Sequence, residues 1–132
     1  MRAVPKVEVP LDPVQSWREL NAVHAAVHTA LELELRREHD LSTIEFEVLE
    51  RLAASPEKMR MQELADAVHI GQSTCSRVVA RLEDEQLTWR AICPNDRRGI
   101  YASVTDAGRE RVAAAAPTYR RVIATTLEAA GG

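Results

Sequence analysis

The chain has 132 residues, of which 45% are hydrophobic and 28% are charged, and its net charge is −3. This length suits one domain, and the composition excludes a wholly disordered chain. No apolar run approaches the ~20 residues that span a bilayer, the first residues lack the apolar core of a secretory signal, and a pair of cysteines forms no disulfide framework. We therefore expect a cytoplasmic protein without a membrane segment.

The charge is unevenly distributed along the chain. Acidic side chains outnumber basic ones in residues 1–58, whereas the two kinds are nearly balanced in residues 59–132. A net negative charge argues against a nucleic-acid partner. The second half can nevertheless carry a surface that faces DNA.

Residues 1–12 contain Pro5 and Pro10 and show no helical period, so we predict a flexible N-terminal arm. Pro13 suits the first turn of a helix. A long helix is expected to follow to about Glu38, within a segment that ends near residue 40. Its apolar positions have helical spacing, and they are Leu20, Val23, Val27, Ala30 and Leu31.

Ser42 and Glu45 have the spacing of a capping box and predict the start of a second helix. Ser55-Pro56 ends it. A short extended piece at 58–61, a short helix at 62–68 and a tight turn at 69–71 are expected next. The buried face of the second helix is predicted to carry Phe46, Leu49, Leu52 and Ala53.

The helix predicted over 72–85 has two different faces. Cys75, Val78, Val79 and Leu82 form a buried stripe. The opposite side is small, polar and basic, and it carries Ser73, Thr74, Arg77, Ala80 and Arg81. Two short helices joined by a three-residue turn, with such an outer face on the second, indicate a helix-turn-helix.

Strands are predicted over 87–92 and 100–104, and the turn residues between them indicate a hairpin. Thr105 is expected to cap a last helix that runs over 106–132, with a kink near Pro117. A hairpin directly after the helix-turn-helix makes the unit a winged helix.

These features are suited to binding double-stranded DNA. A helix fits the major groove, and small side chains at Ser73, Thr74 and Ser76 let its N-terminus approach phosphate. Arg77 and Arg81 lie one turn apart and can reach guanine edges or phosphates. Two further arginines, Arg97 and Arg98, lie at the hairpin tip and can enter the minor groove.

The sequence resembles the MarR family of transcriptional regulators. The resemblance lies in LSTIEFEVLERLA, in MQELADAVHIGQSTCSRVVARLEDEQL, in CPNDRRGIYASVT and in the segment 105–109. It implies a mainly helical (α+β) winged helix-turn-helix over 41–105, with dimerisation helices over 13–40 and 106–132. It also implies a homodimer on double-stranded DNA with a palindromic operator, repression as the usual role, and control by a small-molecule effector.

Individual residues match the family's motifs. The recognition-helix positions are Ser73, Thr74, Ser76, Arg77 and Arg81, and the wing-tip positions are Arg97 and Arg98. Asp96 matches the acid that braces the wing arginine, although Asp is also a common turn residue.

The sequence departs from the family's pattern in three ways. Gln86 replaces the usual Gly after the recognition helix, and Gly71 replaces the usual Ser or Thr cap. The chain also ends about one helix earlier than usual, so the long first helix is expected to supply most of the dimer interface.

Other residues leave alternatives open. Trp17, His24 and His28 can pack in an interface, bind an effector or, for the His pair, contribute to a metal site. Cys75 is expected to be a small buried hydrophobe, and thiol sensing is an alternative at Cys93. The chain carries no common catalytic motif, so we expect neither an enzyme nor a cofactor. The alternative function is a winged-helix module that binds protein, or a metal- or thiol-responsive regulator.

Overall fold

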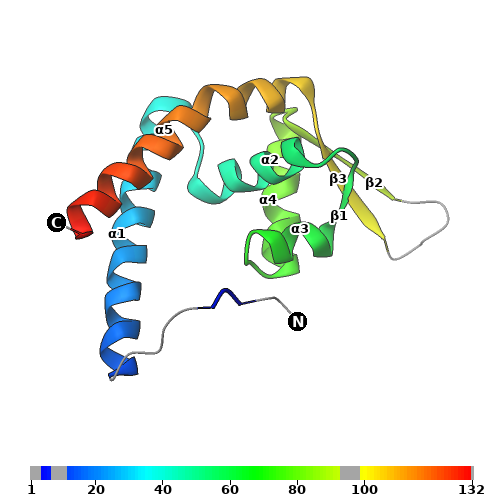
Figure 1. The fold of residues 1–132 in the computed structure, drawn as a ribbon. Helices are drawn as coiled ribbons and strands as arrows, with labels where there is room; N and C mark the ends of the chain where they lie inside the picture. Colours follow the sequence, from blue (N-terminus) through cyan, green and yellow to red (C-terminus); the bar gives the residue numbers. More distant parts are fainter. Residues whose placement is uncertain (1–3, 7–11, 93–98, 132) are drawn as a thin grey trace.

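The computed structural model describes residues 4–6, 12–92 and 99–131. The fold is mainly helical with a small antiparallel sheet, which confirms the predicted class (Figure 1). The elements in chain order are α1 (Pro13–His39), α2 (Thr43–Ala54), β1 (Met59–Arg60), α3 (Met61–Ala67), α4 (Gln72–Asp84), β2 (Thr88–Ile92), β3 (Ile100–Val104) and α5 (Asp106–Gly131).

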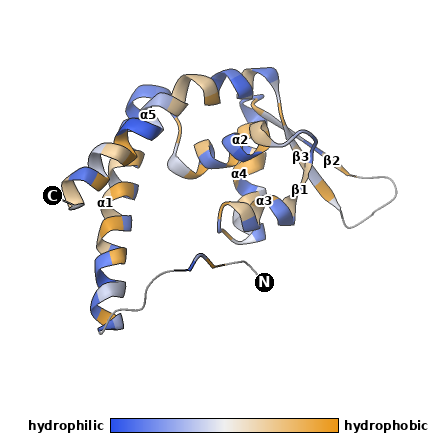
Figure 2. Cartoon of the chain, viewed as in Figure 1, coloured by the Kyte–Doolittle hydropathy of each residue, from blue (hydrophilic) through white to orange (hydrophobic). Residues whose placement is uncertain are grey.

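Helices α2, α3 and α4 and the sheet form one compact unit, which we call the lobe. The sheet has the order β1-β3-β2, and Ile92 pairs with Ile100 where β2 and β3 approach the hairpin tip. Figure 2 shows apolar residues on the sides of the helices that face each other. The centre of the core is fully buried and includes Phe46, Leu49, Leu64, Val79 and Leu82.

The capping box predicted at the start of α2 is present. Glu45 N–H donates to Ser42 Oγ at 3.1 Å, and Ser42 N–H donates to Glu45 Oε1 at 2.7 Å. Both side chains are buried. The box therefore fixes where α2 begins, directly after the end of α1.

Three helices end on a residue with left-handed backbone. Among the described residues, Asp40, His69 and Gln86 have φ values of 54°, 60° and 63°. After α4, Gln86 N–H donates to the Glu83 carbonyl at 2.9 Å and Leu87 N–H donates to the Leu82 carbonyl at 3.0 Å. These two bonds make a Schellman motif, in which glycine is the usual left-handed residue. Gln86 therefore occupies a conformation that disfavours its side chain.

Helices α1 and α5 pack side by side outside the lobe (Figure 1). Leu31 and Leu35 of α1 and Val122 of α5 are buried and belong to the same apolar core as the lobe residues. Helix α5 passes through Pro117 without interruption, and Figure 1 shows it changing direction along its length. Tyr119 of α5 contacts the lobe, because its hydroxyl donates to Glu47 of α2 at 2.7 Å.

The N-terminal half of α1 has an apolar face that no other described residue covers. At 100° per residue, Trp17, His24 and His28 share the face that Leu31 and Leu35 bury further along the helix. Trp17 is 62% exposed, and the neighbouring Leu20 is 56% exposed. None of the helices in the described part of the chain is both long and apolar enough to cross a membrane.

Candidate nucleic-acid interface

Helix α4 has the two faces that its sequence predicts. Cys75, Val79 and Leu82 are fully buried in the lobe. On the opposite side, Ser73, Arg77 and Arg81 are exposed, while Thr74 and Ser76 are half-buried. The helix therefore presents a small, polar N-terminal turn followed by two arginines to the outside.

The start of α4 has free hydrogen-bonding capacity. Gly71 is its N-cap residue and supplies no side-chain hydrogen bond to the first turn. The orphan N–H groups of this turn can therefore bind an anion. The surroundings of Gly71 are open, since a Cβ built there meets nothing within 4 Å.

The two arginines of α4 are held differently. Arg77 makes one long hydrogen bond to Thr74 Oγ1, at 3.3 Å. Arg81 Nε lies 3.3 Å from Oε2 of Glu45, whose side chain is only 5% exposed, whereas the Arg81 side chain is 67% exposed. Glu45 thus caps α2 and anchors Arg81 with the same carboxylate. Sequence patterns did not reveal this second role, because no local signal shows that the start of α2 meets α4.

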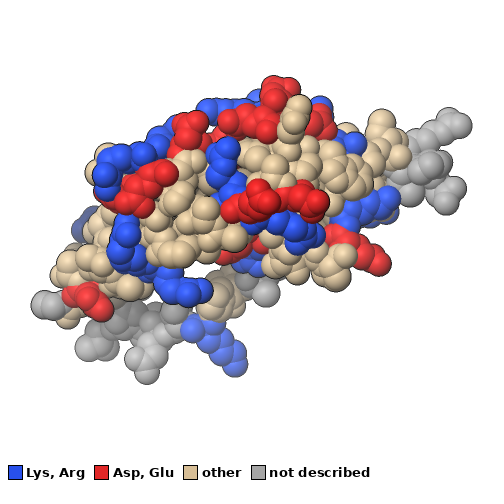
Figure 3. All heavy atoms as spheres, turned by 90° about the horizontal axis from the view of Figure 1, so that it is seen from above, with Lys and Arg blue, Asp and Glu red and all other residues tan. Residues whose placement is uncertain are grey.

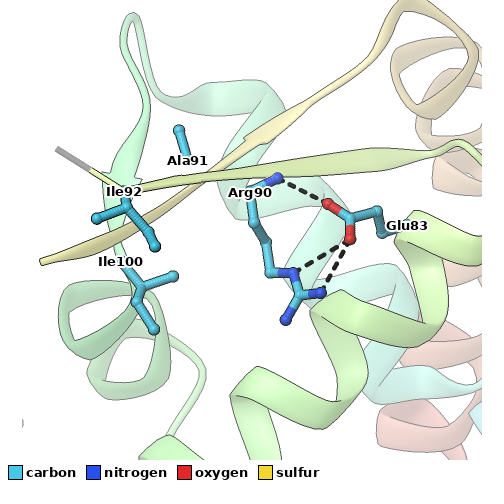
Figure 4. Close-up of a pocket in the computed structure, with 5 residues that line it drawn as sticks. All are labelled: Glu83, Arg90, Ala91, Ile92 and Ile100. Atoms are coloured by element: carbon cyan, nitrogen blue, oxygen red, sulfur yellow. Dashed lines mark hydrogen bonds and ion pairs between the residues drawn. The ribbon is translucent and has the colours of Figure 1, made fainter. Parts of the chain in front are cut away.

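The wing, which we define as residues 88–104, is tied to α4 through β2. The buried Thr88 hydroxyl donates to the Val79 carbonyl at 2.9 Å. Further along, Glu83 accepts the backbone N–H of Arg90 at 2.9 Å and its guanidinium at 3.0 and 3.2 Å (Figure 4). These hydrogen bonds lower the pKa of the Glu83 carboxyl. Neither residue of this pair was predicted from the sequence as a site residue.

The pair borders an open hollow between the end of α4 and the wing. Its volume is about 340 Å³, and Figure 4 shows Ile92 and Ile100 on its other side. Ile92 is 69% exposed. The remaining predicted wing residues, Asp96, Arg97 and Arg98, lie outside the described residues, and so does Cys93.

The junction of α4, the wing and α5 depends on two small residues. The Thr105 hydroxyl donates to the Gln86 carbonyl at 2.7 Å and accepts the Gly108 N–H at 3.0 Å. Thr105 therefore caps α5, as predicted, and also ties it to the end of α4. A Cβ at Gly108 would overlap the Leu87 carbonyl oxygen and the Val104 side chain. Gly108 is thus needed for this close approach.

The face seen in Figure 3 differs from a DNA-binding surface. Lys and Arg side chains are interspersed there with Asp and Glu, in keeping with the net charge of −3. Phosphate backbones require an excess of basic groups. The face in Figure 3 therefore lacks the excess of basic groups that such a contact requires.

The proposed effector residues lie on α1. Trp17, His24 and His28 are all exposed in the single chain. The rings of His24 and His28 are stacked, with centroids 6.2 Å apart and an angle of 11° between their planes. An effector site at these residues stays a prediction.

Two observations bear on the metal alternative and on Cys75. Within the described ranges, no three His, Cys, Asp or Glu side chains are grouped so that they could hold a metal ion. Burial raises the pKa of the Cys75 thiol to about 11. Because the thiolate is the reactive species, this environment makes Cys75 a poor sensor.

Comparisons with known proteins agree with this geometry. The profile of the MarR family matches residues 41–100. The transcriptional regulator MhqR of Bacillus subtilis is 33% identical over 70 residues, which cover 53% of this chain and 48% of MhqR. The chain thus spans about half the length of this curated relative.

Two solved structures from Streptomyces coelicolor extend the likeness to the whole fold. Sco3205, a MarR family transcriptional regulator crystallised in complex with DNA, has a TM-score of 0.80 and 30% identity, covering 93% of this chain and 77% of its own. AbsC, also of the MarR family, has a TM-score of 0.78 and 28% identity, covering 92% of this chain and 82% of its own. The chain therefore belongs to the MarR family, which is a family of winged-helix transcriptional regulators and not of enzymes.

Proposed function

We propose that the protein is a dimeric, sequence-specific DNA-binding transcriptional regulator that acts in the cytoplasm. The observation that carries the proposal is the outer face of α4, with an uncapped N-terminus followed by Arg77 and Arg81. A helix of this kind fits the major groove. The complex of Sco3205 with DNA supports the same use of this fold.

The side chains of α4 contact different parts of the DNA in this proposal. Ser73, Thr74 and Ser76 allow the start of α4 to approach the sugar-phosphate backbone. Arg77 is held only loosely and can turn to a base edge. Arg81 is anchored by Glu45 and is suited to a fixed phosphate contact.

In this proposal the wing contacts the flanking minor groove. Arg97 and Arg98 bind there, where the potential is most negative, and Asp96 braces the wing arginine. Thr88 and Arg90 support this role by fixing the base of the wing to α4.

The dimer uses the uncovered face of α1. Large apolar side chains such as Trp17 and Leu20 are exposed in the single chain, and burying them against a second copy is favourable. Two-fold symmetry then places the α4 helices about one helical turn apart, ~10 bp between half-site centres. The preferred operator is accordingly palindromic.

We further propose that a small-molecule effector sets the spacing between the two lobes, by binding one dimer geometry better than the other. The stacked rings of His24 and His28, with Trp17 on the same side of α1, supply apolar surface and polar atoms for such a ligand. Release of a repressor from its operator is the expected response.

The test begins with selection of fragments from a random DNA pool by the full chain. Affinity is then measured by fluorescence anisotropy on the selected fragment and on a scrambled one. Replacing Arg77 by Ala should cost about 1–3 kcal/mol on the selected DNA and reduce discrimination. Arg18→Ala is the matched control, because Arg18 is an exposed arginine on α1.

Arg98→Ala should weaken binding without changing the dimer. Equal discrimination by the wild type and Arg77→Ala would contradict the role of α4. Failure of a folded dimer to select any DNA would instead favour the protein-interaction module.

A further inference from the structure

Strand β2 meets α4 at successive positions on one side of the strand. Thr88, Arg90 and Ile92 alternate along β2 and so point the same way. Thr88 binds Val79 in the buried base of the wing, and Arg90 binds Glu83 one helical turn further along α4. Ile92 is 69% exposed. In the described part of β2, the Glu83–Arg90 pair is thus the outermost tie to α4.

The carboxylate of Glu83 accepts every hydrogen bond of this contact between β2 and α4. Glu83 accepts the Arg90 backbone N–H through one oxygen and the guanidinium through the other (Figure 4). A bond to the backbone fixes the strand itself, whereas a side-chain pair alone fixes only the side chains. The contact therefore sets the position of β2 relative to α4.

We propose that Glu83 and Arg90 are positioning residues that hold the wing at a fixed angle to α4, so that both engage DNA together. This inference rests on the proposed function. A strand β2 that is already fixed to α4 avoids the entropy cost of being positioned on binding. Misplacing a supporting group by a small amount weakens contacts made far from it.

A direct phosphate contact from Arg90 fits the structure less well. Its guanidinium is paired with Glu83 at 3.0 Å, and both side chains are only partly exposed, at 38% and 34%. The pair carries no net charge, so it gains little from the electrostatic attraction of phosphates. Arg77, with a single long hydrogen bond, is far freer to reach DNA.

The test uses Glu83→Gln, Arg90→Gln, the double variant and the charge-reversed pair Glu83→Arg with Arg90→Glu. Each is titrated with the DNA selected by the wild type, at several salt concentrations. Arg18→Gln controls for the loss of one positive charge on another element. Urea unfolding checks that the lobe remains folded, since partly exposed ion pairs add little to folding stability.

We expect each single variant to lower affinity about tenfold, the equivalent of about 1.4 kcal/mol, with no further loss in the double variant. The charge-reversed pair should recover little of the affinity, because an arginine at position 83 cannot accept the backbone N–H of residue 90. Arg98→Ala should cost less in the Glu83→Gln protein than in the wild type, because the wing is already misplaced. A role in folding alone would not produce this non-additivity.

Hydrogen exchange tests the same claim without DNA. The amides of residues 88–92 should exchange faster in Glu83→Gln than in the wild type, because an outer tie of the strand is lost. Unchanged exchange together with unchanged DNA affinity would overturn the inference.

Two other results are also decisive. If Arg90→Gln alone weakens binding and reduces the slope of log K against log salt by about one, Arg90 is a phosphate contact and the inference is wrong. If the wild type selects no DNA, the proposed function falls and the inference with it.

Discussion

The lobe and the N-terminal half of α1 bury their apolar side chains in different ways. In the lobe, Phe46 is fully buried, and the helices are closed by caps within the same chain. In the first half of α1, Trp17 and Leu20 are more than half exposed. The core of the lobe is thus closed within one chain, whereas the described residues leave this face of α1 exposed.

The two regions therefore differ in whether their stability depends on protein concentration. The lobe's core is closed within one chain, so its folding stability need not depend on protein concentration. In the proposed dimer, a second copy buries the face of α1, so the contribution of this face to stability depends on protein concentration. Substitutions test this comparison. Those in the lobe core should change the free energy of unfolding, and those on α1 should change the dissociation constant of the proposed dimer.

The largest effect is expected in the lobe core. Phe46→Ala should lower the free energy of unfolding by about 3–5 kcal/mol, because it removes a ring packed against the core and leaves a cavity. Urea unfolding followed by circular dichroism measures the change. Trp89→Ala is the aromatic control, since Trp89 is 42% exposed on β2. A loss in the control as large as in Phe46→Ala would contradict our placement of the core.

The second effect concerns α1. Leu20→Ser should weaken the dimer by about 2 kcal/mol per chain, because one exposed leucine no longer becomes buried. Sedimentation equilibrium measures the dissociation constant. Leu33→Ser is the matched control, since Leu33 is 64% exposed on the opposite side of α1. If both variants shift the constant equally, the interface is not on the face we propose.

A smaller effect, an increase in folding stability, is expected at the end of α4. Gln86→Gly should stabilise the lobe by about 1 kcal/mol, because glycine adopts the left-handed backbone without the cost that a Cβ imposes. Asp40→Gly, at a similar φ, should gain less, since Asp tolerates this conformation better than Gln. The melting temperature reports both changes, and a loss of stability in Gln86→Gly would refute the account of this cap.

The smallest effect is expected between α1 and α5. The hydroxyl of Thr118 donates to Glu38 at 2.8 Å and lowers the pKa of that carboxyl below its ordinary value of 4.5, with help from Arg121. A lowered folded-state pKa stabilises the fold above pH 4.5, and the stabilisation is lost as the pH falls through the lower folded-state value. The wild type should therefore exceed Glu38→Gln slightly in stability at pH 7, and the gap should close below pH 4.5. A gap that stays constant down to pH 3 would contradict this contact.

Much of the lobe could be predicted because its signals are local. The Ser42 and Glu45 pair lies within one turn, and the buried stripe of α4 repeats within the helix. The strand predicted over 100–104 coincides with β3. Each of these patterns depends on residues that are close in the sequence, so it can be recognised without knowledge of how the elements pack.

The contacts that tie elements together could not be predicted in the same way. Glu83 meets Arg90 only because a Schellman turn redirects the chain after α4, and Glu45 meets Arg81 only because α2 packs across α4. Along α1, one helical period continues from Trp17 to Leu35, although only its C-terminal part is buried in the chain. Periodicity shows which face is covered, and it does not show what covers it.

The central claim is that α4 and the wing bind DNA through basic groups. It is tested most directly by fluorescence anisotropy of the wild type with selected and scrambled DNA at 50 and 200 mM salt. With about 6 phosphate contacts in the dimer, affinity should fall by about a thousandfold over this range, while the selected fragment remains preferred. Binding that is equally tight at both salt concentrations, or equal for both fragments, would contradict the account.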